Sequence, residues 1–236
     1  MRTRAVILAA GKSVRMHSAL TKVLHPLAGR AMIWYGIDAA RAASGEKPVV
    51  IVGEHNGEAI RQEVGEAAEY ALQEPQLGTG HAVQQAEGLL RSQADLVLVI
   101  TADMPLLTAE TLQSLVQAQE ANEGPITMLT LIADDPRGFG RVVRDNAGQV
   151  KAIVEDAQAT PEQRLIRELN ASAYCFRSGW LWQNLSRIAL SPKGEYYLTD
   201  LVEIAVSDGL KVQALVAEDA SETIGINNRV HLAEAE

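Results

Sequence analysis

The sequence is poor in cysteine: Cys175 is the only one among 236 residues. A single cysteine cannot form an intrachain disulfide, which excludes a disulfide-stabilised secreted domain and favours a cytoplasmic setting. Cys175 lies in the apolar stretch "NASAYCFR" at 170–177, where we expect an inert core thiol. The five histidines are scattered and lack the close Cys/His spacing of a zinc site.

Long hydrophobic runs are also missing. No stretch approaches the roughly 20 apolar residues that cross a bilayer, so no membrane span is expected. Two arginines precede an apolar run at 5–10, as in a secretory signal, but the run is short and Gly11-Lys12-Ser13 follows it directly. We therefore interpret this run as a buried strand and not as a leader.

Positive charge is scarce as well. With 21 Lys and Arg against 30 Asp and Glu, the formal net charge is −9 at pH 7. Nucleic acids and anionic membranes attract basic faces, so neither is expected as a partner. A local cationic pocket for a small phosphate ligand remains compatible with this charge. The apolar fraction of 47% and the charged fraction of 22% are those of a globular protein.

The first half of the chain alternates strand and helix patterns. Three short runs are aliphatic on both faces, at 5–10, 49–53 and 96–100. Such runs are typical of parallel strands covered by helices. Helical patterns cover 31–43, 57–66 and 79–91, and one more follows the candidate N-cap Thr108. We predict the α/β class, with a Rossmann-like three-layer arrangement in which a mixed, mostly parallel sheet is flanked by helices.

The rhythm changes after about residue 125. The patterns there indicate a strand at 126–132, a hairpin at 141–155 with its turn near 146–148, a strand at 170–177, a helix at 196–209, a strand at 211–217 and a short closing helix at 227–236. We find no linker or internal repeat. The sequence therefore predicts one domain over 1–236, with a nucleotide-binding half at about 1–124 and a second half, about 125–236, that completes the sheet and walls a cleft.

A loop after the first predicted strand carries candidate phosphate ligands. Ligands of open α/β sheets bind beyond the carboxyl ends of the strands. Residues 9–11 are small and permit close backbone approach, and Arg15 and Lys22 can neutralise phosphate oxygens. The loop is not a P-loop, because that motif needs a glycine five positions before Gly11, where Val6 stands. A simple turn with solvated cations is the alternative.

Two further segments follow predicted strands. Asp103 comes directly after one of them and is placed to hold Mg²⁺, although a turn or N-cap aspartate is the alternative. In the other segment, Gly78 and Gly80 permit close backbone approach or a positive φ. Thr79 between them is expected to cap the following helix. Gln73 and Gln76 offer amides that suit the edge of a nucleobase.

These motifs resemble a known family. "LAAGKSVRM", followed by a lysine, is similar to the signature loop of the sugar-1-phosphate nucleotidyltransferases. Further motifs narrow the resemblance, over almost the whole chain, to the uridyltransferase (pyrophosphorylase) domain of bacterial bifunctional N-acetylglucosamine-1-phosphate uridyltransferase. They are "QLGTGHA", "DDPRGFGRVVR", "IVEDAQATPEQ", "KGEYYLTD" and "GINNR".

The resemblance implies a role for each matching position. The nucleotide would contact Leu8, Ala9, Ala10, Gly11, Gln73, Gln76, Gly78 and Thr79. The catalytic cations Arg15 and Lys22 would bind the phosphates of UTP. Asp103 and Asn227 would ligate Mg²⁺, and Gly140, Glu155 and Asn170 would hold the sugar. The residues alone do not point to Asn227, which reads as a helix cap.

The implied reaction joins two anions, UTP and a sugar 1-phosphate. A phosphate oxygen of N-acetylglucosamine 1-phosphate would attack the α-phosphorus of UTP in line, giving UDP-N-acetylglucosamine and pyrophosphate. This nucleophile is already ionised at neutral pH, so no general base is needed and catalysis rests on charge stabilisation and orientation. Losing one preorganised donor such as Arg15 is expected to cost on the order of 10²–10³ in rate.

Several positions depart from the family pattern. Ser13-Val14 replace Gly-Thr, Thr21 replaces a proline, Ala102 replaces a glycine, and Ala171-Ser172 replace Thr-Gly. We expect Ala102 to reduce ligand affinity and Ser172 to crowd or alter the N-acetyl pocket. The charged groups are intact, which favours tuned specificity over lost activity. The alternatives are transfer to another sugar phosphate or from another nucleotide, and a non-catalytic nucleotide-sugar-binding relative.

Length is a further departure. Bifunctional members of the family continue into a hexapeptide-repeat β-helix that acetylates glucosamine 1-phosphate and forms a trimer. We find no such repeat in the 236 residues, so we interpret the chain as either an excised domain or a single-function relative. We expect no acetylation by this polypeptide, and the sequence sets no oligomeric state.

Overall fold

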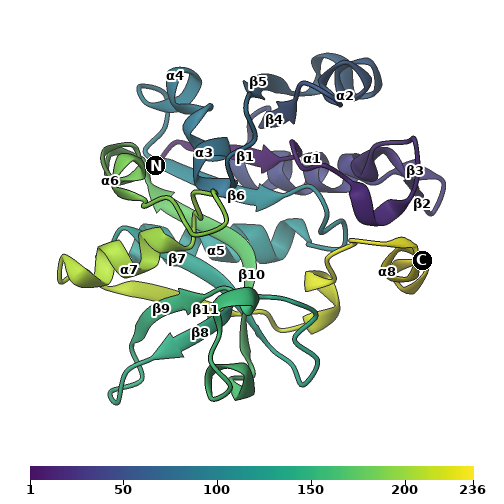
Figure 1. Cartoon of the computed structure of the whole chain (residues 1–236). Helices are drawn as coiled ribbons and strands as arrows, with labels where there is room; N and C mark the ends of the chain where they lie inside the picture. Colours follow the sequence, from purple (N-terminus) through teal and green to yellow (C-terminus); the bar gives the residue numbers. More distant parts are fainter.

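A nine-stranded sheet runs through the centre of the computed structural model, which describes residues 1–236 (Figure 1). Its main path has the order β11-β7-β10-β6-β1-β4-β5. These strands are β1 (Thr3–Leu8), β4 (Val49–Gly53), β5 (Glu69–Gln73), β6 (Leu96–Thr101), β7 (Ile126–Ile132), β10 (Glu168–Arg177) and β11 (Val212–Val216). β6, β1, β4 and β5 run parallel, β11 is parallel to β7, and β10 is antiparallel to both of its neighbours in the path. The predicted mixed, mostly parallel sheet is confirmed.

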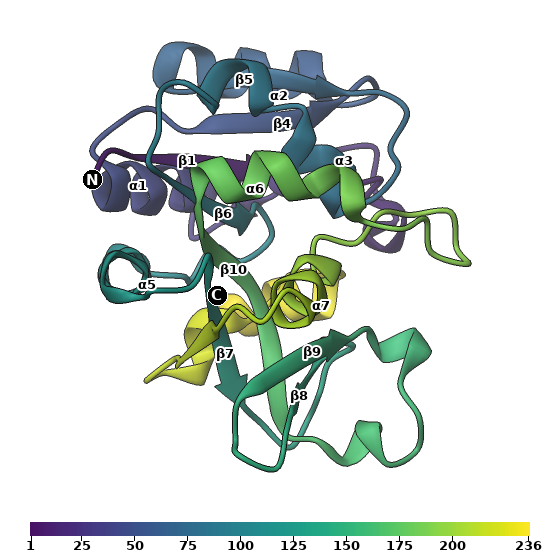
Figure 2. The ribbon, with the colours of Figure 1, turned by 90° about the vertical axis from the view of Figure 1, so that its left-hand side faces the viewer.

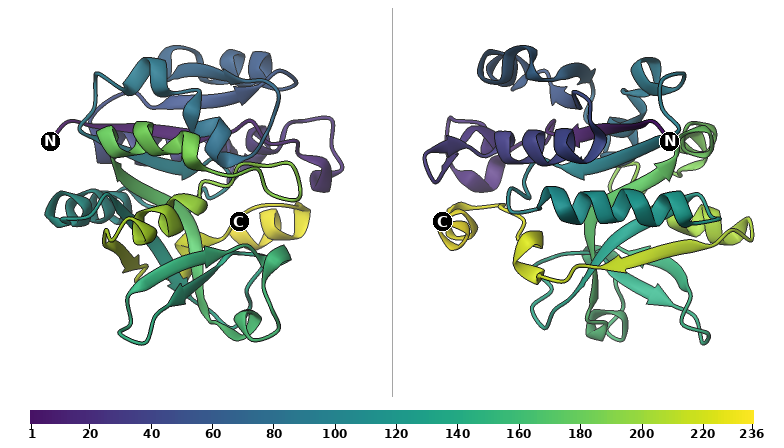
Figure 3. Two further views of the ribbon diagram at one scale, coloured as in Figure 1. Left: turned by 60° about the vertical axis from the view of Figure 1, so that its left-hand side comes forward. Right: turned by 180° about the vertical axis from the view of Figure 1, so that it is seen from behind.

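Helices cover both faces of this sheet. One face carries α1 (Ile33–Ser44), α2 (Gly57–Val64) and α5 (Ala109–Ala121), and the other carries α3 (Thr79–Gln84), α4 (Glu87–Leu90), α6 (Ser178–Asn184) and α7 (Asp200–Ser207). Figure 3 shows α1 and α5 side by side in front of the strands when the molecule is seen from behind. The predicted three layers are confirmed.

The pleat of the strands explains why two cores form. Successive side chains of a strand point to opposite faces. In β1, Ala5 and Ile7 pack with the helices of the α1 face, whereas Val6 packs with those of the α3 face. All three side chains are fully buried. Consecutive apolar residues are therefore required in this part of the strand, where both faces are covered.

A hairpin of β8 (Arg141–Arg144) and β9 (Val150–Val154) stands beside β10, at the opposite end of the molecule from β4 and β5 (Figure 2). Its turn is closed by the Asp145 amide, which donates to the Gln149 carbonyl at 2.9 Å, so the predicted turn is confirmed. The open end of the hairpin places Gly140 and Glu155 next to β10.

The C-terminal segment returns to the N-terminal loops. It ends in α8 (Arg229–Ala235), which lies near the small β2–β3 hairpin (Pro26–Leu27 and Arg30–Ala31) (Figure 1). Leu232 of α8 packs against a small cluster of Leu27, Met32 and Ile226. Residues far apart in sequence therefore meet beside the first loop.

Several element predictions are wrong in detail. The pattern at 79–91 forms two short helices, α3 and α4, and not one. β1 ends at Leu8, and Ala9 and Ala10 continue the apolar run because each packs in one of the two cores, not because they belong to the strand. The strand expected to end near Gln73 was given no bounds and is β5, whereas α6 was not predicted. No helix is long and apolar enough to cross a membrane.

Candidate active site

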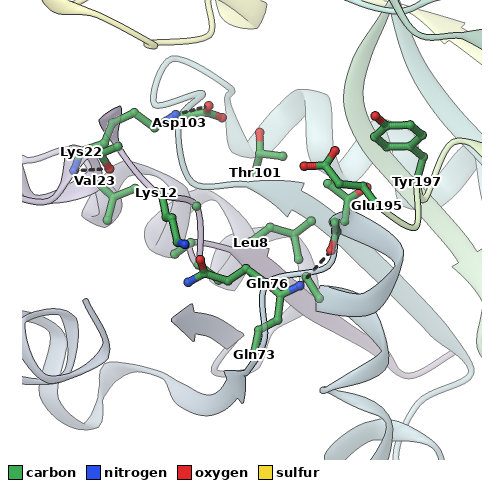
Figure 4. A pocket seen from close by; sticks show the side chains of 17 residues that line it. Leu8, Lys12, Lys22, Val23, Gln73, Gln76, Thr101, Asp103, Glu195 and Tyr197 are labelled. Carbon is green, nitrogen blue, oxygen red and sulfur yellow. Dashed lines mark hydrogen bonds and ion pairs between the residues drawn. The ribbon is translucent and has the colours of Figure 1, made fainter. Parts of the chain in front are cut away.

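The carboxyl ends of β1, β5 and β6 open on a cleft of about 560 Å³. Parallel strands bring their ends to one edge of the sheet, and the loops that follow them form the walls. Of the residues predicted to bind nucleotide or metal, those lining the cleft are Leu8, Ala9, Ala10, Gly11, Lys22, Gln73, Gln76, Gly78, Thr79 and Asp103. Figure 4 shows Lys12, Gln76, Glu195 and Tyr197 around the same space.

A network of four polar side chains reaches the cleft through Lys22 and Asp103, whereas its other two members, Arg15 and Asn227, do not line it. The Lys22 ammonium donates to Oδ2 of Asp103 at 2.6 Å and to the amide oxygen of Asn227 at 3.2 Å. Arg15 donates to the same Asn227 oxygen at 2.9 Å. Figure 4 shows the Lys22 and Asp103 side chains reaching toward each other. The structure thus brings together Arg15, Lys22, Asp103 and Asn227, as their predicted roles require.

These neighbours keep the Asp103 carboxyl ionised. Burial by itself raises the pKa of the Asp103 carboxyl, but the Lys22 ammonium beside it outweighs this and holds that pKa below its usual value. The Asp103 side chain is 22% exposed. Asp103 is therefore an anion at neutral pH, in a position that a ligand can reach.

This pair of oxygens fits a hard divalent cation. A carboxylate and an amide oxygen are ligands that such a cation prefers, and the Lys22 ammonium already contacts both. No group of three His, Cys, Asp or Glu side chains that could hold a metal ion is present. A metal bound between Asp103 and Asn227 would therefore take its other ligands from water and substrate phosphates.

Backbone contacts fix the segments that carry the network. The amide of Ile226 donates to the Asp103 carbonyl at 2.8 Å, which places the neighbouring Asn227. Arg229 donates to the carbonyls of Met16 and His17 at 3.2 and 3.0 Å and ties α8 to the loop of Arg15. The reading of Asn227 as a helix cap is wrong, because Asn228 caps α8 by accepting from the His231 amide at 2.9 Å.

Gln73 and Gln76 both line the cleft, but each amide nitrogen already has a partner. Gln73 Nε2 lies 2.9 Å from the Gly78 carbonyl, and Gln76 Nε2 lies 3.0 Å from Nδ1 of His55. The Gln76 amide oxygen is buried with no hydrogen-bond partner. An unpartnered buried acceptor is costly, and a ligand donor would remove that cost.

The glycine-rich segment after Gln73 is shaped by a second piece of chain. A Cβ on Gly78, whose φ is +95°, would lie 2.7 Å from the Tyr196 carbonyl oxygen. The Gly80 amide donates to that oxygen at 2.8 Å, and the Leu198 amide donates to the Thr79 hydroxyl at 2.9 Å. The expected cap by Thr79 is wrong: its hydroxyl serves the 196–198 segment, and α3 has no side-chain cap. The close approach permitted by the glycines is to Tyr196.

A second cavity of about 200 Å³ adjoins the cleft and shares Leu8, Thr79, Thr101 and Tyr197 with it. It is lined by the three residues predicted to hold the sugar, Gly140, Glu155 and Asn170. They come from the loop before β8, the end of β9 and the middle of β10. The two cavities form one path, with Thr101 where they meet.

Polar groups in the second cavity are mostly anchored. Glu155 accepts from the Thr199 hydroxyl at 2.9 Å, and the Asn170 amide donates to the Tyr174 hydroxyl at 2.6 Å. Burial raises the pKa of Glu155, against the effect of Thr199. Burial, with Glu155 and Glu203 nearby, also raises the pKa of Asp200 to about 6. Glu155, which lines the cavity, therefore influences the protonation of Asp200, which lines neither cavity.

Several lining residues were not predicted. In the cleft they include Lys12, Thr101, Glu195 and Tyr197; in the second cavity they include Phe139, Tyr174 and Thr199, whereas Ser172 lines it as expected. Glu195, Tyr197 and Thr199 belong to the quoted motif "KGEYYLTD", which was a usable signal although none of its residues was assigned a role. Phe139 likewise belongs to the quoted motif "DDPRGFGRVVR". Tyr174 carries no such signal, since an aromatic side chain in a strand usually packs in a core.

A nucleotide-sized cleft with clustered cations at the strand ends of a three-layer α/β sheet defines a nucleotidyltransferase. The chain belongs to the family of MobA-like NTP transferase domains, whose model matches residues 5–172. Over 98% of its length it is 45% identical to the bifunctional protein GlmU of Bacillus licheniformis and 47% identical to that of Exiguobacterium sibiricum. The resemblance stated from the motifs is confirmed.

The chain spans about half the length of these relatives, 51% and 52%. Among solved structures, a putative glucose-1-phosphate thymidylyltransferase from Bacillus anthracis, crystallised with sucrose, superposes with a TM-score of 0.80. The match covers 99% of this chain and 93% of that one at 18% sequence identity, so it supports the fold alone.

Proposed function

We propose that this chain transfers the uridylyl group of UTP to N-acetylglucosamine 1-phosphate and releases pyrophosphate. The observation that carries the proposal is the meeting of Lys22, Asp103 and Asn227 at the end of a cleft that continues into a second polar cavity. Two anionic substrates can lie end to end along such a path, with cations where their phosphates meet. A cytoplasmic setting, argued from the single cysteine, belongs to the same proposal.

The choice of substrates is supported by the relatives and the motifs. Relatives that match 98% of the chain are named bifunctional protein GlmU, and the motifs resemble the uridyltransferase domain of N-acetylglucosamine-1-phosphate uridyltransferase. The unpartnered Gln76 oxygen is an acceptor of the kind that the N–H of a uracil ring can satisfy. The nucleotide thus belongs in the cleft, and the sugar belongs beside Gly140, Glu155 and Asn170.

The residues of the chain then act by position and charge. Arg15 and Lys22 hold phosphate oxygens and offset the charge that builds up in the transition state. Mg²⁺, when held by Asp103 and Asn227, neutralises the reacting phosphates. Lys22 contacts both proposed metal ligands, so it leaves Asp103 and turns to a phosphate as substrate binds. No side chain needs to accept a proton from the ionised nucleophile.

A second candidate has the same chemistry with a different sugar phosphate or nucleotide. Ser172, which stands where the family pattern has a glycine, lines the sugar cavity and alters its wall. A panel of nucleotides and sugar 1-phosphates, followed by pyrophosphate release, separates the two candidates. Turnover with UTP and N-acetylglucosamine 1-phosphate supports the first, and turnover only with another pair supports the second.

A non-catalytic nucleotide-sugar-binding protein would behave differently. It would bind a UDP-sugar but release no pyrophosphate with any pair of the panel. The Asp103→Ala variant would then change affinity alone. For a transferase, the same variant loses turnover, and this experiment decides between the two classes.

A further inference from the structure

Arg141, the first residue of β8, is a charged side chain in the interior, only 2% exposed. Its Nη1 donates to the Phe139 carbonyl at 2.5 Å and to Oδ1 of Asp156 at 2.6 Å. Its Nε is buried with no partner. The Arg141 guanidinium is thus excluded from solvent over most of its surface, and one of its N–H donors has no hydrogen-bond partner.

The two partners of Arg141 are chain neighbours of residues that line the sugar cavity. Phe139 directly precedes Gly140, and Asp156 directly follows Glu155. One nitrogen atom therefore ties the loop that enters β8 to the turn that leaves β9. The Gly140 carbonyl also accepts a hydrogen bond from the backbone amide of Asn170 at 2.9 Å, which joins the third predicted sugar residue to the loop before β8.

Stability alone does not account for this arginine. Burying the Arg141 guanidinium costs desolvation, and its attraction to Asp156, which is itself 45% exposed, offsets only part of that cost. The unpartnered Nε adds to the cost. What the guanidinium supplies and an apolar side chain cannot is a fixed separation between the two segments that carry Gly140 and Glu155.

We propose that Arg141 is a positioning residue for the sugar phosphate: through Phe139 and Asp156 it holds Gly140 and Glu155 in register on one wall of the sugar cavity. This inference rests on the proposed function. It assigns the Arg141–Asp156 pair to one substrate alone, because Gly140 and Glu155 line the sugar cavity and not the nucleotide cleft.

Asp156→Ala is the most direct test, because the Asp156 side chain is 45% exposed and its loss removes little packing. We expect the KM for N-acetylglucosamine 1-phosphate to rise about tenfold, since small misplacements of binding groups carry costs of this order or more. The KM for UTP stays at its native value. Asp156→Asn, which keeps an acceptor oxygen for Arg141, restores part of the loss.

Arg144 supplies a matched control on the same strand. It also binds one backbone carbonyl, that of Gly148 at 2.8 Å, and one carboxylate, that of Glu168 at 2.6 Å, but neither of these partners is the chain neighbour of a residue that lines a cavity. Glu168→Gln breaks that pair without touching the sugar wall, so both KM values stay native. Arg141→Lys, whose single ammonium lacks the planar guanidinium fork, should resemble Asp156→Ala, with thermal unfolding recorded to show that it folds.

Two outcomes overturn the inference: an unchanged KM for the sugar phosphate in both Asp156→Ala and Arg141→Lys, or an equal rise in the KM values of both substrates. In either case the native chain still turns over, so the proposed function stands. Failure of the proposed function looks different, because the native chain itself then releases no pyrophosphate from UTP and the sugar phosphate.

Discussion

At the scale of the single residue, Lys22 occupies the place that the proposed chemistry gives to a metal ion. Its ammonium lies 2.6 Å from Asp103 and 3.2 Å from the Asn227 oxygen, and its side chain is 17% exposed. A cation in this position keeps the two oxygens together in the absence of substrate. It also competes with any other cation for them.

Replacing Lys22 by methionine should therefore separate two effects. We expect Lys22→Met to bind Mn²⁺ on the order of tenfold more tightly in the absence of nucleotide, a gain of about 1.4 kcal/mol, because the competing charge is gone. Turnover should fall by about 10²–10³, because a phosphate-binding donor is lost. Titration of free Mn²⁺ by electron paramagnetic resonance measures the first effect, and pyrophosphate release measures the second.

Lys12→Met is the matched control for the metal titration. Lys12 lines the same cleft but makes no side-chain hydrogen bond or ion pair with Asp103 or Asn227. Its loss should leave Mn²⁺ affinity native. Equal Mn²⁺ affinities for native protein and Lys22→Met would contradict the competition described above.

The raised pKa of Asp200 makes the stability of the protein depend on pH. This pKa is raised by burial, by Glu155 and by Glu203, from 3.8 to about 6. The native state therefore holds a proton that the unfolded chain releases between these values. It follows that the free energy of unfolding falls as pH rises from about 4 to about 6, through this group.

Asp200→Asn should remove that dependence. The variant is expected to be about 1 kcal/mol more stable than the native protein at pH 7, a figure kept small because the half-buried carboxyl is partly screened by solvent. The two proteins should converge near pH 4. Urea unfolding at pH 4, 6 and 7 measures this, and a variant less stable at every pH would refute it.

At the scale of the element, β10 contains an irregularity at the sugar cavity. The register of its pairing with β7 shifts between Asn170 and Tyr174, and Ser172 has a φ of +53°. This is the left-handed region, in which a residue with a Cβ is strained. The substitution of serine for the family's glycine is thus placed where a glycine is conformationally preferred.

Ser172→Gly should stabilise the protein by about 0.5–1 kcal/mol. Relief of strain in the folded chain outweighs the greater freedom that glycine gives to the unfolded chain. The thermal midpoint measures this gain. Ala171→Gly, at a fully buried neighbour without a positive φ, is the control and should be destabilising. A loss of stability in Ser172→Gly would show that the side chain contributes more than its strain costs.

In the loop before α3, by contrast, we expect that adding a side chain to a glycine destabilises the protein. A Cβ on Gly78 would meet Tyr196 backbone atoms at 2.7 and 2.8 Å, and the φ of +95° is unfavourable to any side chain. Gly78→Ala should destabilise the protein by about 1–3 kcal/mol and weaken binding of the nucleotide. Thermal unfolding and UTP titration measure the two effects. Gly88→Ala, in α4 with open space around its Cβ position, should cause neither.

Which elements were predictable follows from their burial. The aliphatic runs of β1, β4 and β6 are buried on both faces and were found. β5 lies at the edge of the sheet, and most of its residues are half-buried or exposed, so it lacks an aliphatic run. The antiparallel direction of β10 leaves no trace in its pattern, because alternation is the same in both directions.

At the scale of the whole molecule, the site is assembled by long returns of the chain. Arg15 and Asn227 are 212 positions apart and yet share a hydrogen bond. Local spacing could place Arg15, Lys22 and Asp103 on strand-end loops, because each follows a recognisable strand. It could not place Asn227, whose position depends on the path taken after β11; only the resemblance to a family suggested its role.

The same returns couple the two halves of the chain. The 196–198 segment from the second half binds the 78–80 loop of the first. Tyr197 of this segment lines both cavities, and the next residue, Leu198, packs in the core. The sheet also continues from β6 to β10 without interruption. That 1–236 form one domain stays a prediction, which a single cooperative unfolding transition by two probes would support.

We propose that a cation held by Asp103 and Asn227 lets UTP and an amino-sugar phosphate react in this cleft. This is tested by following UDP-N-acetylglucosamine and pyrophosphate by ³¹P nuclear magnetic resonance, with native protein, UTP, N-acetylglucosamine 1-phosphate and Mg²⁺. We expect equal amounts of both products, and none when Mg²⁺ is chelated or when Asp103 is replaced by alanine. Product formation that persists in Asp103→Ala, or native protein that binds both substrates and forms no product, would contradict it.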